Sequence, residues 1–211
     1  MNVGNRSVRW GLAMLLWASL TAIAATSPSQ AQTPDSVIRE TADEVIAAIK
    51  ADKAIQAGDR KRAYDLINQK VLPHFDFVHM TRLAVGRYWR DATPDQQKRL
   101  MDGFRDLLVR TYASSLSQYK DQVVQIKGTE ETAGDPEAVV HTLLVPSGGQ
   151  TIPIDYNMEK MGTDWKVYDI KVDGVSLVTN YRSEFADIVR RNGLDGLIKA
   201  LDDKRKAAEK Q

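Results

Sequence analysis

The three histidines are the first residues whose type could support chemistry, because imidazole binds metals and transfers protons. They are His74, His79 and His141. His74 and His79 are five positions apart, so on a helix they would point to different faces, whereas zinc-binding pairs are spaced i, i+4. The chain has no cysteine, so thiol nucleophiles, disulfides and cysteine-bound zinc are excluded. We therefore expect no metal site and no cofactor.

The carboxylates in the strand-like part of the chain could form an acid/base pair. Asp155 or Asp169, together with His141 or Tyr168, could serve a small isomerase or dehydratase. Asp155 alternates with the apolar residues of its strand, however, and should point away from an apolar interior. The turn at 147–149 lies between two predicted strands and fits neither a nucleophile elbow nor a phosphate loop. The sequence favours carboxylates that face solvent or pair with cationic residues, and it keeps this enzyme as the alternative.

Residues 1–31 have the pattern of a secretory signal peptide. Arg6 and Arg9 precede an apolar run at 10–25. The small residues Ser29 and Ala31 then form a cleavage-site pattern before Gln32. The run is shorter than the roughly 20 residues of a membrane span, so we expect cleavage after Ala31 and export. We expect one domain at 32–203 and a charged, flexible tail at 204–211. With 29 Lys+Arg against 28 Asp+Glu, the charge balance argues against nucleic-acid binding.

Helical periodicity and capping residues predict four helices before any strand. They cover 34–57, 59–72, 76–85 and 94–112. Period-two segments follow at 123–127, 138–145, 151–158 and 165–172, and a last helical pattern covers 178–201. The connections between the period-two segments are too short for crossover helices, so the sheet should be antiparallel. The predicted fold class is α+β, with helices and an antiparallel sheet of about four strands.

Two groups of residues, spread over nearly the whole chain after the leader, resemble the signatures of the MlaC family. The first group comprises His74-Phe75-Asp76-Phe77, Met80, Leu83, Gly86-Arg87-Tyr88-Trp89-Arg90, Thr93-Pro94 to Gln97, Phe104-Arg105 and Leu107 to Tyr112. The second comprises Ile152 to Tyr156, Trp165 to Ile170, Asp173 to Leu177, Asn180-Tyr181-Arg182, Phe185 and Gly193 to Leu197. The combination is specific although each piece alone is weak.

The resemblance implies a periplasmic phospholipid carrier that helps to maintain the lipid asymmetry of the outer membrane. The partners it implies are an inner-membrane ABC transporter with an MCE-domain subunit and an outer-membrane complex of a lipoprotein with a porin. It also implies a strongly twisted sheet of the nuclear-transport-factor (NTF2-like) type, with acyl chains in an apolar cavity between sheet and helices. We expect a monomer that catalyses no reaction.

The predicted wall of the lipid site combines the apolar face of the sheet with the longest helix. Its members are Phe104, Leu108, Tyr112, Ile152, Ile154, Tyr156, Tyr168, Ile170, Val172, Val175 and Leu177. The same pattern also builds an ordinary core, and a purely structural periplasmic adaptor would have that core filled. No basic cluster in the sequence marks a headgroup site, so the headgroup is expected near solvent.

Overall fold

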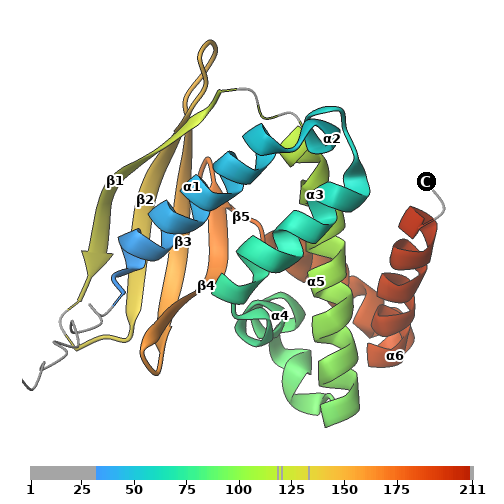
Figure 1. Cartoon of the computed structure of the whole chain (residues 1–211). Coiled ribbons are helices and arrows are strands. Elements are labelled where there is room, and N and C mark those ends of the chain that lie inside the picture. Colours follow the sequence, from blue (N-terminus) through green and yellow to red (C-terminus); the bar gives the residue numbers. More distant parts are fainter. Residues whose placement is uncertain (1–31, 118, 120, 133, 210–211) are drawn as a thin grey trace, which may run out of the picture. The chain divides into compact units, whose positions relative to one another are not determined.

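Six α-helices and five strands make up the described part of this computed structural model, which is residues 32–209 except 118, 120 and 133 (Figure 1). The helices are α1 (Pro34–Ala51), α2 (Lys53–Gln56), α3 (Arg60–Leu66), α4 (Phe77–Val85), α5 (Pro94–Ser117) and α6 (Arg182–Glu209). The strands are β1 (Val123–Glu131), β2 (Glu137–Val145), β3 (Ile152–Met161), β4 (Asp164–Val172) and β5 (Val175–Ser176). The expected leader lies outside the described residues.

Side-chain caps begin the helices at the positions that the sequence predicts. Thr33 and Asp59 cap α1 and α3. Asp76 accepts a hydrogen bond of 2.9 Å from the third amide of α4. Thr93 and Gln96 each bond the other's backbone amide, at 3.2 and 3.0 Å, in a capping box that begins α5. These local signals depend on only a few neighbouring residues, which is why sequence alone reveals them.

Two breaks within the predicted helices are corrections. Asp52 interrupts the predicted helix at 34–57, because its carboxylate accepts hydrogen bonds from the amides of Ala54 and Ile55 and starts α2. After α3 the backbone passes into a π-helical turn, Ile67–Val71, and a 3₁₀ turn, Leu72–His74. Helix α6 continues to Glu209 through most of the charged segment at 204–211. The division of the chain into a leader, a domain and a flexible tail stays a prediction.

The sheet is antiparallel and follows chain order, β1-β2-β3-β4-β5. It has one strand more than expected. The turn at Asp173 and Gly174, whose φ angles are 51° and 77°, sends the chain back along β4 as the short strand β5. Two residues are too few to show an alternating pattern, so the sequence does not predict β5. A parallel bridge from Phe75 pairs with the other part of the same β4 edge.

A β-bulge interrupts the alternation of β4. Met158 of β3 pairs with Val167, and the residue before Met158 pairs with Asp169, so Tyr168 is an extra residue without a partner on β3. As a result, the inner-face apolar residues of β4 have odd numbers up to Val167 and even numbers from Ile170 onward. Both sets lie on the same face of the sheet.

Helix α1 crosses one face of the sheet, and the other helices lie beside it, with α5 between α3 and α6 (Figure 1). We call the face that α1 covers the inner face. Val37 and Ile38 of α1 pack on it. A second core joins α4, α5 and α6 around Phe104 and Phe185. One hydrophobic core therefore lies between the sheet and α1, and a second lies among α4, α5 and α6.

Candidate functional site

The inner face of the sheet has two halves that differ in how much protein covers them. In the packed half, five side chains are at most 6% exposed and pack with Val37 and Ile38 of α1: Ala138, Val140, Met158, Trp165 and Val167. In the open half, the apolar side chains are half-buried or exposed: Val124, Ile126, Leu144, Ile152, Ile154, Tyr156, Ile170, Val172 and Val175. A continuous apolar surface without full protein cover is suited to an apolar ligand.

The strand register brings the open half together. Ile154 pairs with Val172, and Tyr156 pairs with Ile170, so these four side chains lie on one face of two neighbouring strands. Val175 of β5 pairs with Val172 at the end of the same face. Six of the predicted wall residues are therefore contiguous: Ile152, Ile154, Tyr156, Ile170, Val172 and Val175.

Tyr156 lies where the open half meets the packed half. Burial raises the pKa of its phenol to about 12, while a hydrogen bond with Thr142 acts in the opposite direction. The side chain nevertheless keeps accessible surface. Tyr156 is therefore closely surrounded by protein and still has surface that a ligand can contact.

The helix residues predicted for the wall lie in different surroundings. Phe104 is fully buried, and the rings of Tyr181 and Phe185 contact it edge-on at 5.4 and 5.3 Å. Leu108 belongs to the same core. Tyr112 is 38% exposed, and partial burial raises the pKa of its phenol. Of these three, Tyr112 is the one with surface available to a ligand.

The structure places Tyr168 apart from the other predicted wall residues. As the extra residue of the bulge, it stacks on His79, with ring centroids 4.4 Å apart, and donates a hydrogen bond of 3.2 Å to Glu137. Burial raises the pKa of Tyr168 to about 12, with the nearby carboxylates adding to the effect. Leu177 is half-buried, and its amide bonds the carbonyl of Ile170 at 2.8 Å. Leu177 thus remains beside the wall, whereas Tyr168 does not.

Three open-half residues were missed by the sequence reasoning: Val124, Ile126 and Leu144. Val124 pairs with Leu144, which pairs with Ile152, so the apolar surface extends from β3 across β2 to the edge strand β1. The alternating residues Val140, Thr142 and Leu144 of β2 are the sequence pattern from which this extension could have been predicted.

The carboxylates of the alternative enzyme do not meet on the inner face. Asp155 pairs with His141 on the opposite face, where the imidazole Nδ1 lies 2.8 Å from a carboxylate oxygen. This hydrogen bond raises the pKa of His141, and the charge of Glu130 adds to the effect. Asp169 is buried, and its carboxylate accepts a hydrogen bond from the amide of Val178. Asp169 therefore fixes the chain after β5.

The described residues contain no group of three or more His, Cys, Asp or Glu side chains arranged to hold a metal ion. In the same part of the chain, no helix is both long enough and apolar enough to cross a membrane.

The fold and the open half define an α+β protein whose antiparallel sheet presents an incompletely covered apolar face. The chain belongs to the MlaC family, whose profile, described as MlaC protein, matches residues 39–203. The resemblance read from the sequence is thereby confirmed.

Two curated relatives and a solved structure resemble the chain over most of its length. A toluene tolerance protein, Ttg2D, of Pseudomonas putida is 30% identical over 82% of this chain and 80% of its own. The intermembrane phospholipid transport system binding protein MlaC of Haemophilus influenzae is 24% identical over 85% of this chain and 86% of its own. A phospholipid-binding protein of Ralstonia solanacearum, solved in complex with a phospholipid, is 36% identical with a TM-score of 0.76, over 82% of this chain and 97% of its own.

Proposed function

We propose that this protein is a periplasmic phospholipid carrier that holds acyl chains against the open half of the inner face. The contiguous apolar surface of the open half, which the protein does not fully cover, is the observation that carries the proposal. The similar protein of Ralstonia solanacearum, which was solved with a phospholipid, supports it.

The energetics explain why such a carrier is needed. Each methylene removed from water contributes about 0.8 kcal/mol, so two acyl chains with roughly thirty methylenes represent on the order of 20 kcal/mol. A phospholipid therefore does not cross an aqueous space unassisted at a useful rate. An apolar sheet face can replace the membrane interior for the chains during transfer.

The finer features of the proposal follow from the family. The carrier moves phospholipid between the inner and outer membranes and maintains outer-membrane lipid asymmetry. Its partners are an inner-membrane ABC transporter with an MCE-domain subunit and an outer-membrane lipoprotein–porin complex. It acts as a monomer of the NTF2-like fold, reaches the periplasm after removal of residues 1–31, and binds its cargo without catalysing a reaction.

Two exposed valines at opposite edges of the sheet provide a matched test. Val175 is 57% exposed and belongs to the open half, whereas Val123 is 54% exposed and alternates with Val124 onto the other face. A carboxylate at the wall must be desolvated when acyl chains cover it. Val175→Asp should therefore lose most of the co-purified phospholipid, whereas Val123→Asp should retain it.

The measurement is organic extraction of detergent-free protein, with mass spectrometry of the lipids per mole of protein. Circular dichroism should show both variants folded, since both sites are already solvent-exposed. A wild-type protein that carries no phospholipid, and takes none up from vesicles, would disprove the carrier. Equal lipid content in the two variants would remove Val175 from the wall.

A further inference from the structure

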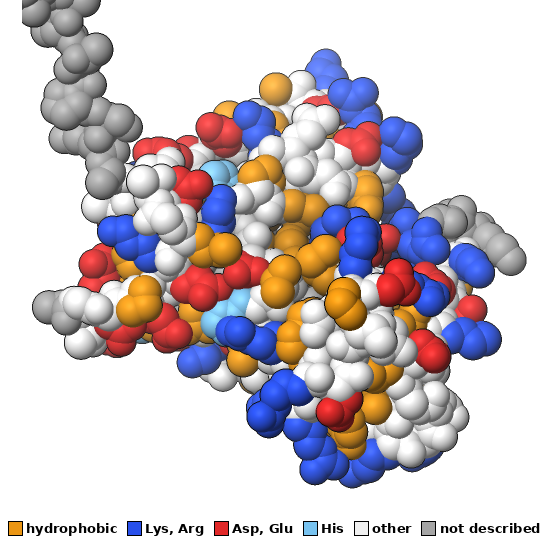
Figure 2. Space-filling model, turned by 90° about the horizontal axis from the view of Figure 1, so that it is seen from below, with side chains coloured by type: hydrophobic (Ala, Val, Ile, Leu, Met, Phe, Trp, Pro, Cys, Tyr) orange, Lys and Arg blue, Asp and Glu red, His pale blue; other side chains and the backbone are white. Residues whose placement is uncertain are grey.

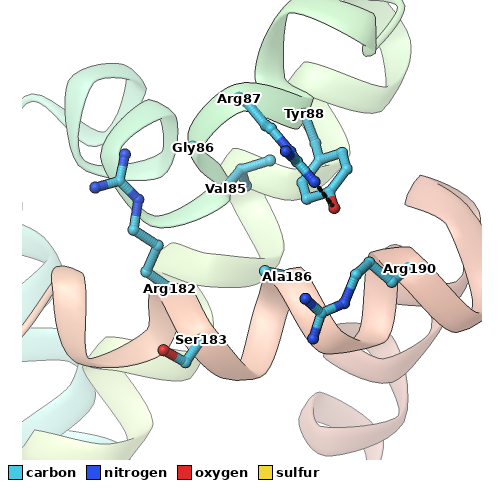
Figure 3. Close-up of a pocket in the computed structure, with 8 residues that line it drawn as sticks. All are labelled: Val85, Gly86, Arg87, Tyr88, Arg182, Ser183, Ala186 and Arg190. Carbon is cyan, nitrogen blue, oxygen red and sulfur yellow. Dashed lines mark hydrogen bonds between the residues drawn. The ribbon is translucent and has the colours of Figure 1, made fainter.

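A pocket of about 370 Å³ lies between the end of α4, the 3₁₀ turn Gly86–Asp91 and the start of α6 (Figure 3). It is separate from the inner face of the sheet. The lining residues are Val85, Gly86, Arg87, Tyr88, Arg182, Ser183, Ala186 and Arg190. No acidic residue is among them. The volume is at the lower end of the range for small-molecule sites.

Three arginines surround this pocket from different sides. Arg182 and Arg190 come from α6, two turns apart on the face that also carries Ala186, and Arg87 comes from the 3₁₀ turn (Figure 3). Val85 and Ala186 lie between the arginines and supply an apolar floor. On the face in Figure 2, Lys and Arg side chains gather along the lower edge, over the helical part of the molecule.

Arg182 is the arginine whose hydrogen-bond donors are not used within the described part of the protein. Its guanidinium has no hydrogen-bond or ion-pair partner among the residues that the structure describes, although it lies beside the backbone of Gly86. A Cβ added at Gly86 would lie 3.1 Å from Nε of Arg182, and the φ of Gly86 is 64°. Gly86 therefore permits the turn and leaves room for the guanidinium at once. Arg182 is exposed at the pocket, so its guanidinium donors are available to an external anion.

The other two arginines are oriented by neighbours that leave donors free. Arg87 donates a hydrogen bond of 3.0 Å to the hydroxyl of Tyr88 and lies over its ring. Arg190 forms an ion pair with Asp187, which reduces the charge of the cluster by one. The pocket keeps a positive excess, and guanidinium groups bind phosphate oxygens in pairs of parallel hydrogen bonds.

We propose that this pocket binds the phosphate group of a small phosphate ester, with Arg182 as the main ligand and Arg87 and Arg190 as supporting cations. The apolar floor and the ring of Tyr88 contact the organic part. The phosphate comes either from a soluble ester or from the exposed headgroup of a phospholipid. The site is independent of the acyl-chain site.

The test is an NMR titration of the purified protein with sn-glycerol 3-phosphate and, separately, with inorganic phosphate. We expect saturable shifts of the amides at 85–88 and 182–190. A lost charge-assisted hydrogen bond weakens binding by about tenfold or more, so Arg182→Ala should raise the Kd of the ester by at least that factor. Arg182→Lys keeps the positive charge but loses the paired donors of the guanidinium. Its Kd for the ester should therefore lie between those of wild type and Arg182→Ala.

Arg191→Ala is the matched control, because Arg191 is exposed on the same helix and does not line the pocket. It should leave the Kd within about twofold of wild type. Absence of saturable shifts at millimolar ester, or equal weakening by Arg191→Ala and Arg182→Ala, would overturn the proposal. If Arg182→Ala does not fold, the Kd of Arg182→Lys is compared with that of Arg191→Ala instead.

Vesicles distinguish the two sources of phosphate. Co-sedimentation with phosphatidylglycerol vesicles that Arg182→Ala abolishes would assign the pocket to lipid headgroups. Ester binding with vesicle binding that is absent, or unaffected by Arg182→Ala, would assign it to a soluble ester. Loss of phospholipid in Val175→Asp with unchanged ester binding would separate this pocket from the acyl-chain site.

Discussion

The ion pair between His141 and Asp155 lies on the face of the sheet opposite the proposed lipid wall. Its hydrogen bond raises the pKa of His141 above the ordinary value of about 6.5. A raised pKa in the folded state means that the pair stabilises the protein fully below the unfolded pKa. This stabilisation is lost as the pH rises through the folded pKa. His141→Gln should therefore lower the free energy of unfolding more at about pH 5.5 than at about pH 9.

Urea denaturation of wild type and His141→Gln at the two pH values measures this difference. Asp155→Asn should show the same dependence, and adding it to His141→Gln should have little further effect. An equal loss at both pH values would contradict the assignment of the pH dependence to this pair.

Helices α5 and α6 approach closely at Gly103, and a Cβ placed there would lie 2.9 Å from Cβ of Leu201. An exposed helical Gly→Ala substitution usually stabilises by roughly 1 kcal/mol, because glycine is a poor helix former. Here the backbone-proximal atom of Leu201 cannot move away easily, so we expect Gly103→Ala to destabilise by about 1–3 kcal/mol. Thermal unfolding measures the effect.

The double variant Gly103→Ala/Leu201→Gly is the control, because only glycine removes the Cβ that would clash. Leu201 is itself buried in a helix, so Leu201→Gly alone should cost about 3–6 kcal/mol. The two changes together should cost less than their sum. An additive result would show that the close approach of the helices has no energetic consequence.

At the scale of the whole molecule, bound lipid should contribute to folding stability, because a ligand that binds only the folded state stabilises it by mass action. Removal of phospholipid should lower Tm by several degrees, and returning lipid from vesicles should restore it. The delipidated protein should also bind the dye ANS at the uncovered apolar face. Calorimetry and dye fluorescence on wild type and Val175→Asp, which should begin in the low-Tm state, provide the measurements. Identical Tm values with and without lipid would contradict a site that spans the open half.

Local patterns predicted the elements better than they predicted contacts between them. The caps at Asp76 and Thr93 and the alternating apolar face of β3 depend on neighbouring residues, and the structure places them as expected. Tyr168 was expected beside Ile170, but the bulge changes the alternation between them, and a single extra residue leaves no periodic signal. Phe104 has the helical spacing of a wall residue, yet only the tertiary structure shows that α6 covers it.

The arginine pocket illustrates the same limit from another direction. Arg87 and Arg182 are far apart in the chain, and neither belongs to a basic run. The turn at Gly86 brings them to one pocket, which no analysis of local charge could anticipate. The sequence therefore has no run of basic residues, but the fold brings basic residues from distant positions together.

The division of the inner face into a packed half and an open half also affects how the protein can evolve. Shortening a packed side chain such as Met158 or Val167 leaves a cavity and destabilises the fold. Shortening Ile154 or Val172 in the open half removes less buried contact, so the folding penalty is smaller. Relatives could therefore enlarge or narrow the space for cargo through substitutions in the open half while the packed half preserves the fold. Cargo capacity and folding stability are encoded by different residues of the same sheet.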